Sequence, residues 1–142
     1  MSALSEKIWN RACGNGPATP GAGDTALMAV LTFHGLAMNG GVVYAIECLT
    51  AGERDAARAG YRYFGFANAA GVIGAGQAAL AQGLDAASLA ETLDDAYVAI
   101  LDDSVLMQAF EARLDAQPAD FADQANCAGL VSNATLCSSQ QK

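Results

Sequence analysis

Hydrophobic residues recur at helical spacing along most of the chain, and turn-forming residues separate the repeats. Residues 3–13 place apolar side chains on one helical face, and residues 14–23 follow as a loop rich in glycine and proline. The next helix starts at residue 24 or 25 and ends at Asn39-Gly40-Gly41, because asparagine and glycine accept the left-handed conformation of a helix end. No segment alternates apolar and polar residues as a half-exposed strand would. The pattern therefore predicts an all-α protein.

The chain after residue 41 shows further helix boundaries. A short helix over residues 42–49 precedes Thr50-Ala-Gly-Glu53, a capping box that starts the helix containing Arg54, Arg58 and Arg62. Residues 67–82 form an Ala/Gly-rich helix, whose glycines favour close helix packing over a phosphate-binding loop because no strand precedes them. Ser88-Leu-Ala-Glu91 predicts a second capping box, and Asp102-Asp103-Ser104 can cap a further helix. We expect a compact bundle of six to eight helices.

The length of 142 residues predicts one domain, which we place at residues 1–128 with a flexible tail over residues 129–142. Residues 25–46 and 63–84 lack formal charges and are long enough to span a bilayer. Their polar and glycine content and the absence of basic flanks favour buried core helices instead. The N-terminus shows no apolar signal segment, so we expect a cytoplasmic protein without a membrane association.

Net charge is confined to one part of the chain. Residues 1–84 hold five acids and five bases, whereas residues 85–123 hold ten acids and one base, Arg113. With Lys142, the chain reaches its net charge of −8. A surface of one sign attracts partners of opposite charge and repels nucleic acid, so direct nucleic-acid binding is not expected.

Helical spacing places several of these acids on outward faces. At 100° per residue, Leu89, Leu93, Ala96 and Ile100 share one face of a helix, while Glu91, Asp95 and Asp102 lie on the opposite face. The acids can bind a partner, or can form a solvated face that keeps a 53% hydrophobic chain soluble. Their spacing does not fit a calcium loop, and no metal or cofactor is expected. The candidate partner-binding residues are Glu91, Asp94, Asp95, Asp102, Asp103, Glu111 and Asp115.

Few other residues suggest chemistry. Cys13 and Cys48 occur in apolar helical contexts and are interpreted as core thiols, whereas Cys127 and Cys137 either stay reduced or form a disulfide. His34 is interpreted as a buried histidine hydrogen-bonded to the backbone, since the spacing supplies no orienting acid and hence no catalytic residue.

Glu47 lies in an apolar helix and, if buried, needs a charged partner such as Arg58 or Arg62. Trp9 is expected to anchor the core or a dimer interface. An alternative hypothesis joins His34 and Glu47 in one pocket of a small enzyme.

The segments from Ala37 to Glu47 and from Ala59 to Gly65, with Ile73-Gly74-Ala75 in the later Ala/Gly-rich helix, form a recognisable combination. Over about residues 25–85, the chain resembles a family of small, acidic, all-helical bacterial domains typified by a DNA-mimic protein. In that family an Asn-Gly-Gly turn followed by an aromatic residue is the signature, and here Asn39, Gly40, Gly41 and Tyr44 form the candidate contact turn. The resemblance implies a cytoplasmic helical domain, often a homodimer, whose acidic surface imitates duplex phosphates.

Two binding functions follow from these features. The first is occupation of a basic surface, such as the DNA-binding face of a regulator, by the acidic C-terminal half. The second is an immunity or antitoxin-type protein that blocks a toxin, which the acidity also suits when the toxin is a nuclease. Both predict a basic protein partner.

Overall fold

The computed structural model describes residues 2–122 of the chain, and within them it contains α-helices, one short 3₁₀ helix and no strand. The prediction of an all-α bundle with six to eight helices is confirmed. The helices are α1 (Ala3–Ala12), α2 (Ala22–Gly40), α3 (Val42–Cys48), α4 (Ala51–Tyr63), α5 (Ala67–Ala81), α6 (Ala86–Ile100), α7 (Asp103–Ala116) and η1 (Pro118–Asp120).

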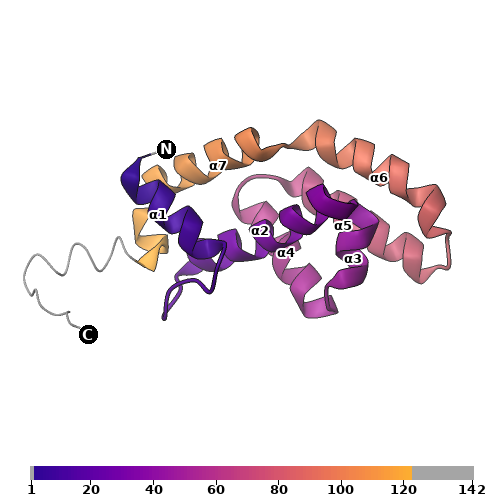
Figure 1. The fold of residues 1–142 in the computed structure, drawn as a ribbon, viewed down its shortest axis with the longest axis horizontal. Helices are drawn as coiled ribbons and strands as arrows, with labels where there is room; N and C mark the ends of the chain where they lie inside the picture. Colours follow the sequence, from indigo (N-terminus) through magenta and orange to yellow (C-terminus); the bar gives the residue numbers. More distant parts are fainter. Residues whose placement is uncertain (1, 123–142) are drawn as a thin grey trace, which may run out of the picture.

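Helix α2 runs through the middle of the molecule and packs on α1, α3 and α4. Helix α5 packs on α4, and α6 packs on α5 and α3. Helices α6 and α7 follow one another along one long edge of the molecule (Figure 1). This arrangement exposes one face of both helices along the same edge.

The helix starts were predicted with mixed success. The capping box at Thr50 is confirmed, because its hydroxyl accepts from the Glu53 N–H at 3.1 Å and the Glu53 carboxylate accepts from the Thr50 N–H at 2.9 Å. The capping box at Ser88 is wrong. Asp85 is the cap of α6, and its carboxylate accepts from the Ser88 N–H at 3.1 Å, so the helix starts three residues earlier than predicted.

Gly41 interrupts residues 25–46, one of the two uncharged stretches, so this stretch does not form one continuous helix. Its φ of 99° lies in the left-handed region that favours glycine, and it separates α2 from α3. Among residues 2–122, no helix has both the length and the apolar character needed to cross a bilayer.

Close packing explains two of the glycines. A Cβ on Gly76 would lie 2.7 Å from Ile46 Cδ1, so the Ile46 side chain of α3 packs directly on the backbone of α5. A Cβ on Gly60 would lie 2.7 Å from the backbone oxygen of Ala26, where α4 crosses α2. The predicted close-packing role of the Ala/Gly-rich helix is confirmed at Gly76, whereas a Cβ on Gly71 would meet no other part of the molecule within 4 Å.

The core is rich in aromatic rings contributed by several helices. Phe33 of α2 packs edge-on against Tyr61 of α4, with ring centroids 6.1 Å apart. Trp9 of α1 is half-buried and packs on Phe110 of α7 at 5.6 Å, as expected of a core anchor. Of the inward positions predicted for α6, Leu93 is confirmed as buried, and α7 buries Leu106, Phe110 and Leu114.

A buried carboxylate joins three parts of the fold. Asp24, with 1% of its surface exposed, pairs with Arg11 of α1 at 2.6 Å. It also accepts from the N–H groups of Gly21 at 3.0 Å and Ala122 at 2.7 Å. The predicted helix start at residue 24 or 25 is wrong, because α2 begins at Ala22 with Gly21 as its cap and Asp24 lies in the first turn. No local spacing indicated this link between α1, α2 and the segment after η1.

Candidate partner-binding surface

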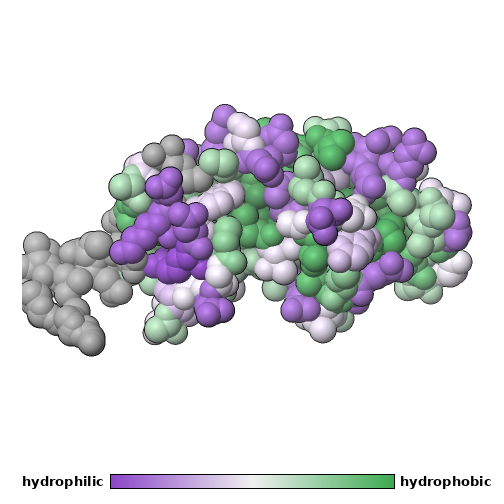
Figure 2. Space-filling view, viewed as in Figure 1, coloured by the Kyte–Doolittle hydropathy of each residue, from purple (hydrophilic) through white to green (hydrophobic). Residues whose placement is uncertain are grey.

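The edge formed by α6 and α7 exposes most of its carboxylates. We call the exposed acids of these two helices and their caps the outer face; they are Asp85, Glu91, Asp95, Asp102, Asp103 and Asp115. Figure 2 shows hydrophilic surface over α7 and over α6, with hydrophobic surface between the two. Exposed Val98 and Val105 belong to this stretch of the chain.

Arg113, the basic residue of residues 85–123, does not neutralise the outer face. Arg113 is half-buried, and its guanidinium lies over the ring of Tyr63 at 4.1 Å from the centroid. This cation–π contact directs the positive charge toward α4 and away from the outer face. Within the described residues, the outer face therefore carries charge of one sign.

One predicted position on this face is wrong in its geometry. Asp102 does not continue the helix that carries Glu91 and Asp95, because α6 ends at Ile100 and the extended, buried Leu101 follows. Asp102 instead caps α7 and accepts from the Val105 N–H at 2.9 Å. The acids are consequently divided between two helices that follow one another along the edge.

Two of the seven candidate acids point inward. The Asp94 Oδ1 atom accepts from the N–H of Val42, the first residue of α3, at 2.8 Å. Glu111 is half-buried and accepts from the Ser5 hydroxyl of α1 at 3.1 Å. Helical periodicity shows which face a residue occupies, but it does not show which neighbouring helix covers that face.

The predicted contact turn lies beside α6. Asn39, Gly40 and Tyr44 are exposed, and Gly41 is half-buried. A Cβ on Gly40 would stand 2.4 Å from Tyr44 Cδ2, so the tyrosine ring rests directly on this glycine. Hydrogen bonding to the Cys48 thiol raises the pKa of the Tyr44 phenol above its ordinary value.

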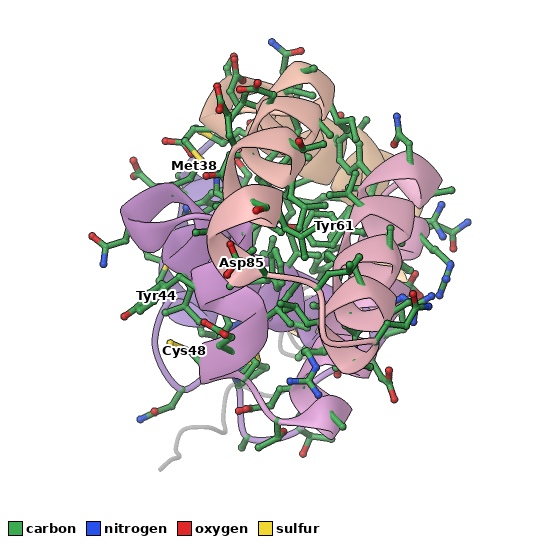
Figure 3. The ribbon with its side chains drawn as sticks, turned by 90° about the vertical axis from the view of Figure 1, so that its right-hand side faces the viewer. Met38, Tyr44, Cys48, Tyr61 and Asp85 are labelled. Atoms are coloured by element: carbon green, nitrogen blue, oxygen red, sulfur yellow. The ribbon has the colours of Figure 1, made fainter. Side chains whose placement is uncertain are left out.

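A chain of four polar side chains runs from the outer face into the core. His34 of α2 is buried, and its Nε2 atom lies 2.6 Å from Oδ1 of Asp103. Its Nδ1 atom lies 2.8 Å from the hydroxyl of Tyr97, which contacts the hydroxyl of Tyr61. Figure 3 shows Tyr61 among the core side chains.

The protons of this chain are assigned from its connectivity. If Tyr61 donates to Tyr97, Tyr97 donates to Nδ1 of His34, and Nε2–H donates to Asp103, every hydrogen has an acceptor. Burial raises the pKa of both tyrosine phenols. Both ring nitrogens of His34 are thus engaged in holding α6 and α7 to α2.

The structure corrects several interpretations of single residues. His34 is buried as expected, but it bonds to side chains rather than to backbone. Glu47 is exposed on α3, so it neither needs Arg58 or Arg62 nor joins His34 in a pocket. Instead, Arg54 donates to the backbone oxygens of Ile46 at 2.8 Å and Leu49 at 2.7 Å.

Cys13 and Cys48 are exposed, so the interpretation of core thiols is wrong. Both occur in the last turn or at the end of short helices, where one face meets solvent. Cys127 and Cys137 lie outside the described residues, as does the tail over residues 129–142. Within the part of the chain that is described, no three or more His, Cys, Asp or Glu side chains are grouped to hold a metal ion.

Sequence reasoning missed Tyr97 and Asp103 as partners of His34. They are separated from it by 63 and 69 residues, and no local spacing connects them. The available signal was Tyr97 on the apolar face of α6, since a buried tyrosine hydroxyl needs a hydrogen-bond partner. Comparison of the chain with protein-family models, with curated proteins and with solved structures finds no match.

Proposed function

We propose that this protein is a non-catalytic binding protein, and that its outer face holds a basic surface of another protein. The supporting observation is the charge of one sign along α6 and α7. Six exposed carboxylates lie there, while Arg113 is directed toward Tyr63. An exposed face of one sign attracts a basic protein over several ångströms and orients it during encounter.

The spacing of the acids favours a partner that normally binds an extended polyanion. Glu91 and Asp95 are four residues apart on α6, which corresponds to about 6 Å along the helix axis. Duplex DNA presents about one charge per 1.7 Å, so the outer face is a sparser array with the same sign. The resemblance to DNA-mimic domains points to a DNA-binding regulator, and a nuclease toxin has the same complementary charge.

Capture from a lysate of the source organism tests the proposal. The tagged chain is compared with two double variants of equal charge: Glu91→Gln with Asp95→Asn on the outer face, and Glu47→Gln with Asp55→Asn on exposed positions of α3 and α4. Bound proteins are eluted by a salt gradient and identified by mass. We expect a basic protein that elutes at low salt, because exposed ion pairs are screened.

The pattern across variants decides the outcome. The proposal predicts that the outer-face variant loses the basic protein and that the control variant retains it. Equal loss in both variants would attribute capture to total charge alone. Equal retention in both would show that binding does not use the outer face, and either result contradicts the proposal.

A further inference from the structure

A cavity of about 260 Å³ lies where the turn between α2 and α3 meets α6. Three large apolar side chains are exposed in this region, with exposed fractions of 51% for Met38, 42% for Tyr44 and 56% for Val98. Met38 and Val98 line the cavity, and Tyr44 rests on Gly40, which also lines it. Met38 and Tyr44 lie on the same side of the molecule in Figure 3.

Among the described residues that line the cavity, Asp94 is the one that carries a carboxylate. Its Oδ1 atom accepts from the Val42 N–H, and its Oδ2 atom stands 3.0 Å from the position of a Cβ on Gly41. A carboxylate has about four acceptor sites, so one bond leaves it able to accept from a ligand. The absence of a side chain on Gly41 keeps the space beside Oδ2 open.

We propose that a lysine side chain of the basic partner enters this cavity, with its aliphatic stem between Met38 and Val98 and its ammonium group on Asp94. Lysine combines a long apolar stem with a compact charge, which matches an apolar rim around a single carboxylate. Arginine binds carboxylates best through two parallel bonds, and here Oδ1 is already engaged by Val42.

This inference rests on the proposed function and specifies where the partner is anchored. Asp94 is adjacent to Asp95 in α6, and Val98 is one turn further along the same helix. Because residues three apart are neighbours on a helix surface, Val98 places the cavity beside Asp95 of the outer face. The acids of the outer face would attract the partner, and the cavity would fix its register.

The experiment uses the full chain labelled with ¹⁵N and three peptides as probes: acetyl-Gly-Lys-Gly-amide, the same peptide with norleucine, and the same peptide with arginine. We expect the lysine peptide to shift the amide signals of Gly40, Gly41, Val42 and Val98. The norleucine peptide has the stem without the charge and is expected to bind weakly. Equal binding of the arginine or norleucine peptide would overturn the assignment of lysine.

Matched variants connect the signal shifts to the cavity. Asp94→Asn keeps an oxygen for the Val42 N–H but removes the charge, and we expect about fivefold weaker binding of the lysine peptide. Val98→Ser is expected to weaken binding, whereas Val105→Ser, an exposed valine on α7 outside the cavity lining, is not. Unchanged binding in both Asp94→Asn and Val98→Ser would overturn the inference, as would shifts spread evenly over α6 and α7.

The partner-capture experiment distinguishes a failure of this inference from a failure of the proposed function. If the lysine peptide fails to bind the cavity while Glu91→Gln with Asp95→Asn still abolishes capture, the anchor is wrong and the outer face remains the binding surface. If capture is unchanged by Glu91→Gln with Asp95→Asn and is also unchanged by Asp94→Asn and by Val98→Ser, both the inference and the proposed function are wrong.

Discussion

The buried Asp24 and the acids of the outer face use the same chemical group in opposite ways. Asp24 is almost completely removed from solvent and receives three donors, from Arg11, Gly21 and Ala122. The carboxylates of Glu91, Asp95 and Asp115 are exposed to water. A buried charge must be paired to be tolerated, whereas an exposed charge stays hydrated and available.

This difference shows that the acidic residues of the chain do not all have the same role. Removing an acid from the first region should affect the free energy of unfolding. Removing an acid from the second should affect binding and leave the fold unchanged. Asp103 connects the regions, because its side chain is exposed while one oxygen holds the buried His34.

The strongest test of the comparison replaces one acid from each region by alanine. Asp24→Ala removes a buried acceptor from the Arg11 guanidinium and from two N–H groups, and we expect a loss of about 3–5 kcal/mol in the free energy of unfolding. Asp115→Ala is the control, since this exposed residue lies in the last turn of α7, and its effect should stay within about 0.5 kcal/mol. Urea unfolding of both variants measures the difference; similar losses would refute it.

Alkaline unfolding extends the comparison to buried hydroxyls. Burial raises the pKa of Tyr61 and Tyr97 in the folded protein above the ordinary value. Above pH 10 the unfolded chain therefore releases these protons while the folded chain retains them, and stability falls as pH rises. The two phenols together lower the free energy of unfolding by about 2.7 kcal/mol per pH unit above pH 10.

Denaturant unfolding at a series of pH values between 8 and about 11 measures this slope. Tyr61→Phe removes one of the two buried hydroxyls and should reduce their contribution to the slope by about half. A slope that Tyr61→Phe leaves unchanged would contradict the role of these phenols.

Asp102 and Asp103 sharpen the comparison between neighbours in sequence. Asp103→Asn weakens the bond to His34, and we expect a loss of about 1 kcal/mol in the free energy of unfolding, because the carboxylate is largely exposed. Asp102→Asn should be nearly neutral, since asparagine and aspartate are equally good N-caps. Thermal unfolding of the two variants measures both losses of stability. A larger loss for Asp102→Asn than for Asp103→Asn would contradict the role assigned to the bond between Asp103 and His34.

The smallest expected effect on stability is on the outer face. Glu91→Gln with Asp95→Asn should change the free energy of unfolding by no more than about 0.5 kcal/mol, since both side chains are exposed. The same variant is expected to lose partner capture. A large loss of stability would show that these carboxylates belong to the fold and not to a binding surface.

Most helix positions could be predicted from local sequence, because periodicity and capping residues act over a few positions. The capping box at Thr50 and the inward position of Leu93 on α6 are examples. At α6, two acceptable caps lie three residues apart, and local preference alone did not separate Asp85 from Ser88.

The direction of individual polar side chains was harder to predict. Asp94, Asp103 and Glu111 look alike in sequence, yet each contacts a different helix: α3, α2 and α1. Such contacts depend on how distant helices are placed, and no local pattern contains this information. Exposure of Glu91 and Asp95 was predicted, because both lie opposite the apolar face of their helix.

The most direct test of the central claim is the salt dependence of the dissociation constant for the captured basic protein. It is measured for the unsubstituted chain, for Glu91→Gln with Asp95→Asn, and for Glu47→Gln with Asp55→Asn. We predict that binding weakens with salt, and that the outer-face variant alone binds more weakly and shows a shallower salt dependence. Identical affinities and salt dependences in the two double variants would contradict a binding role for the outer face.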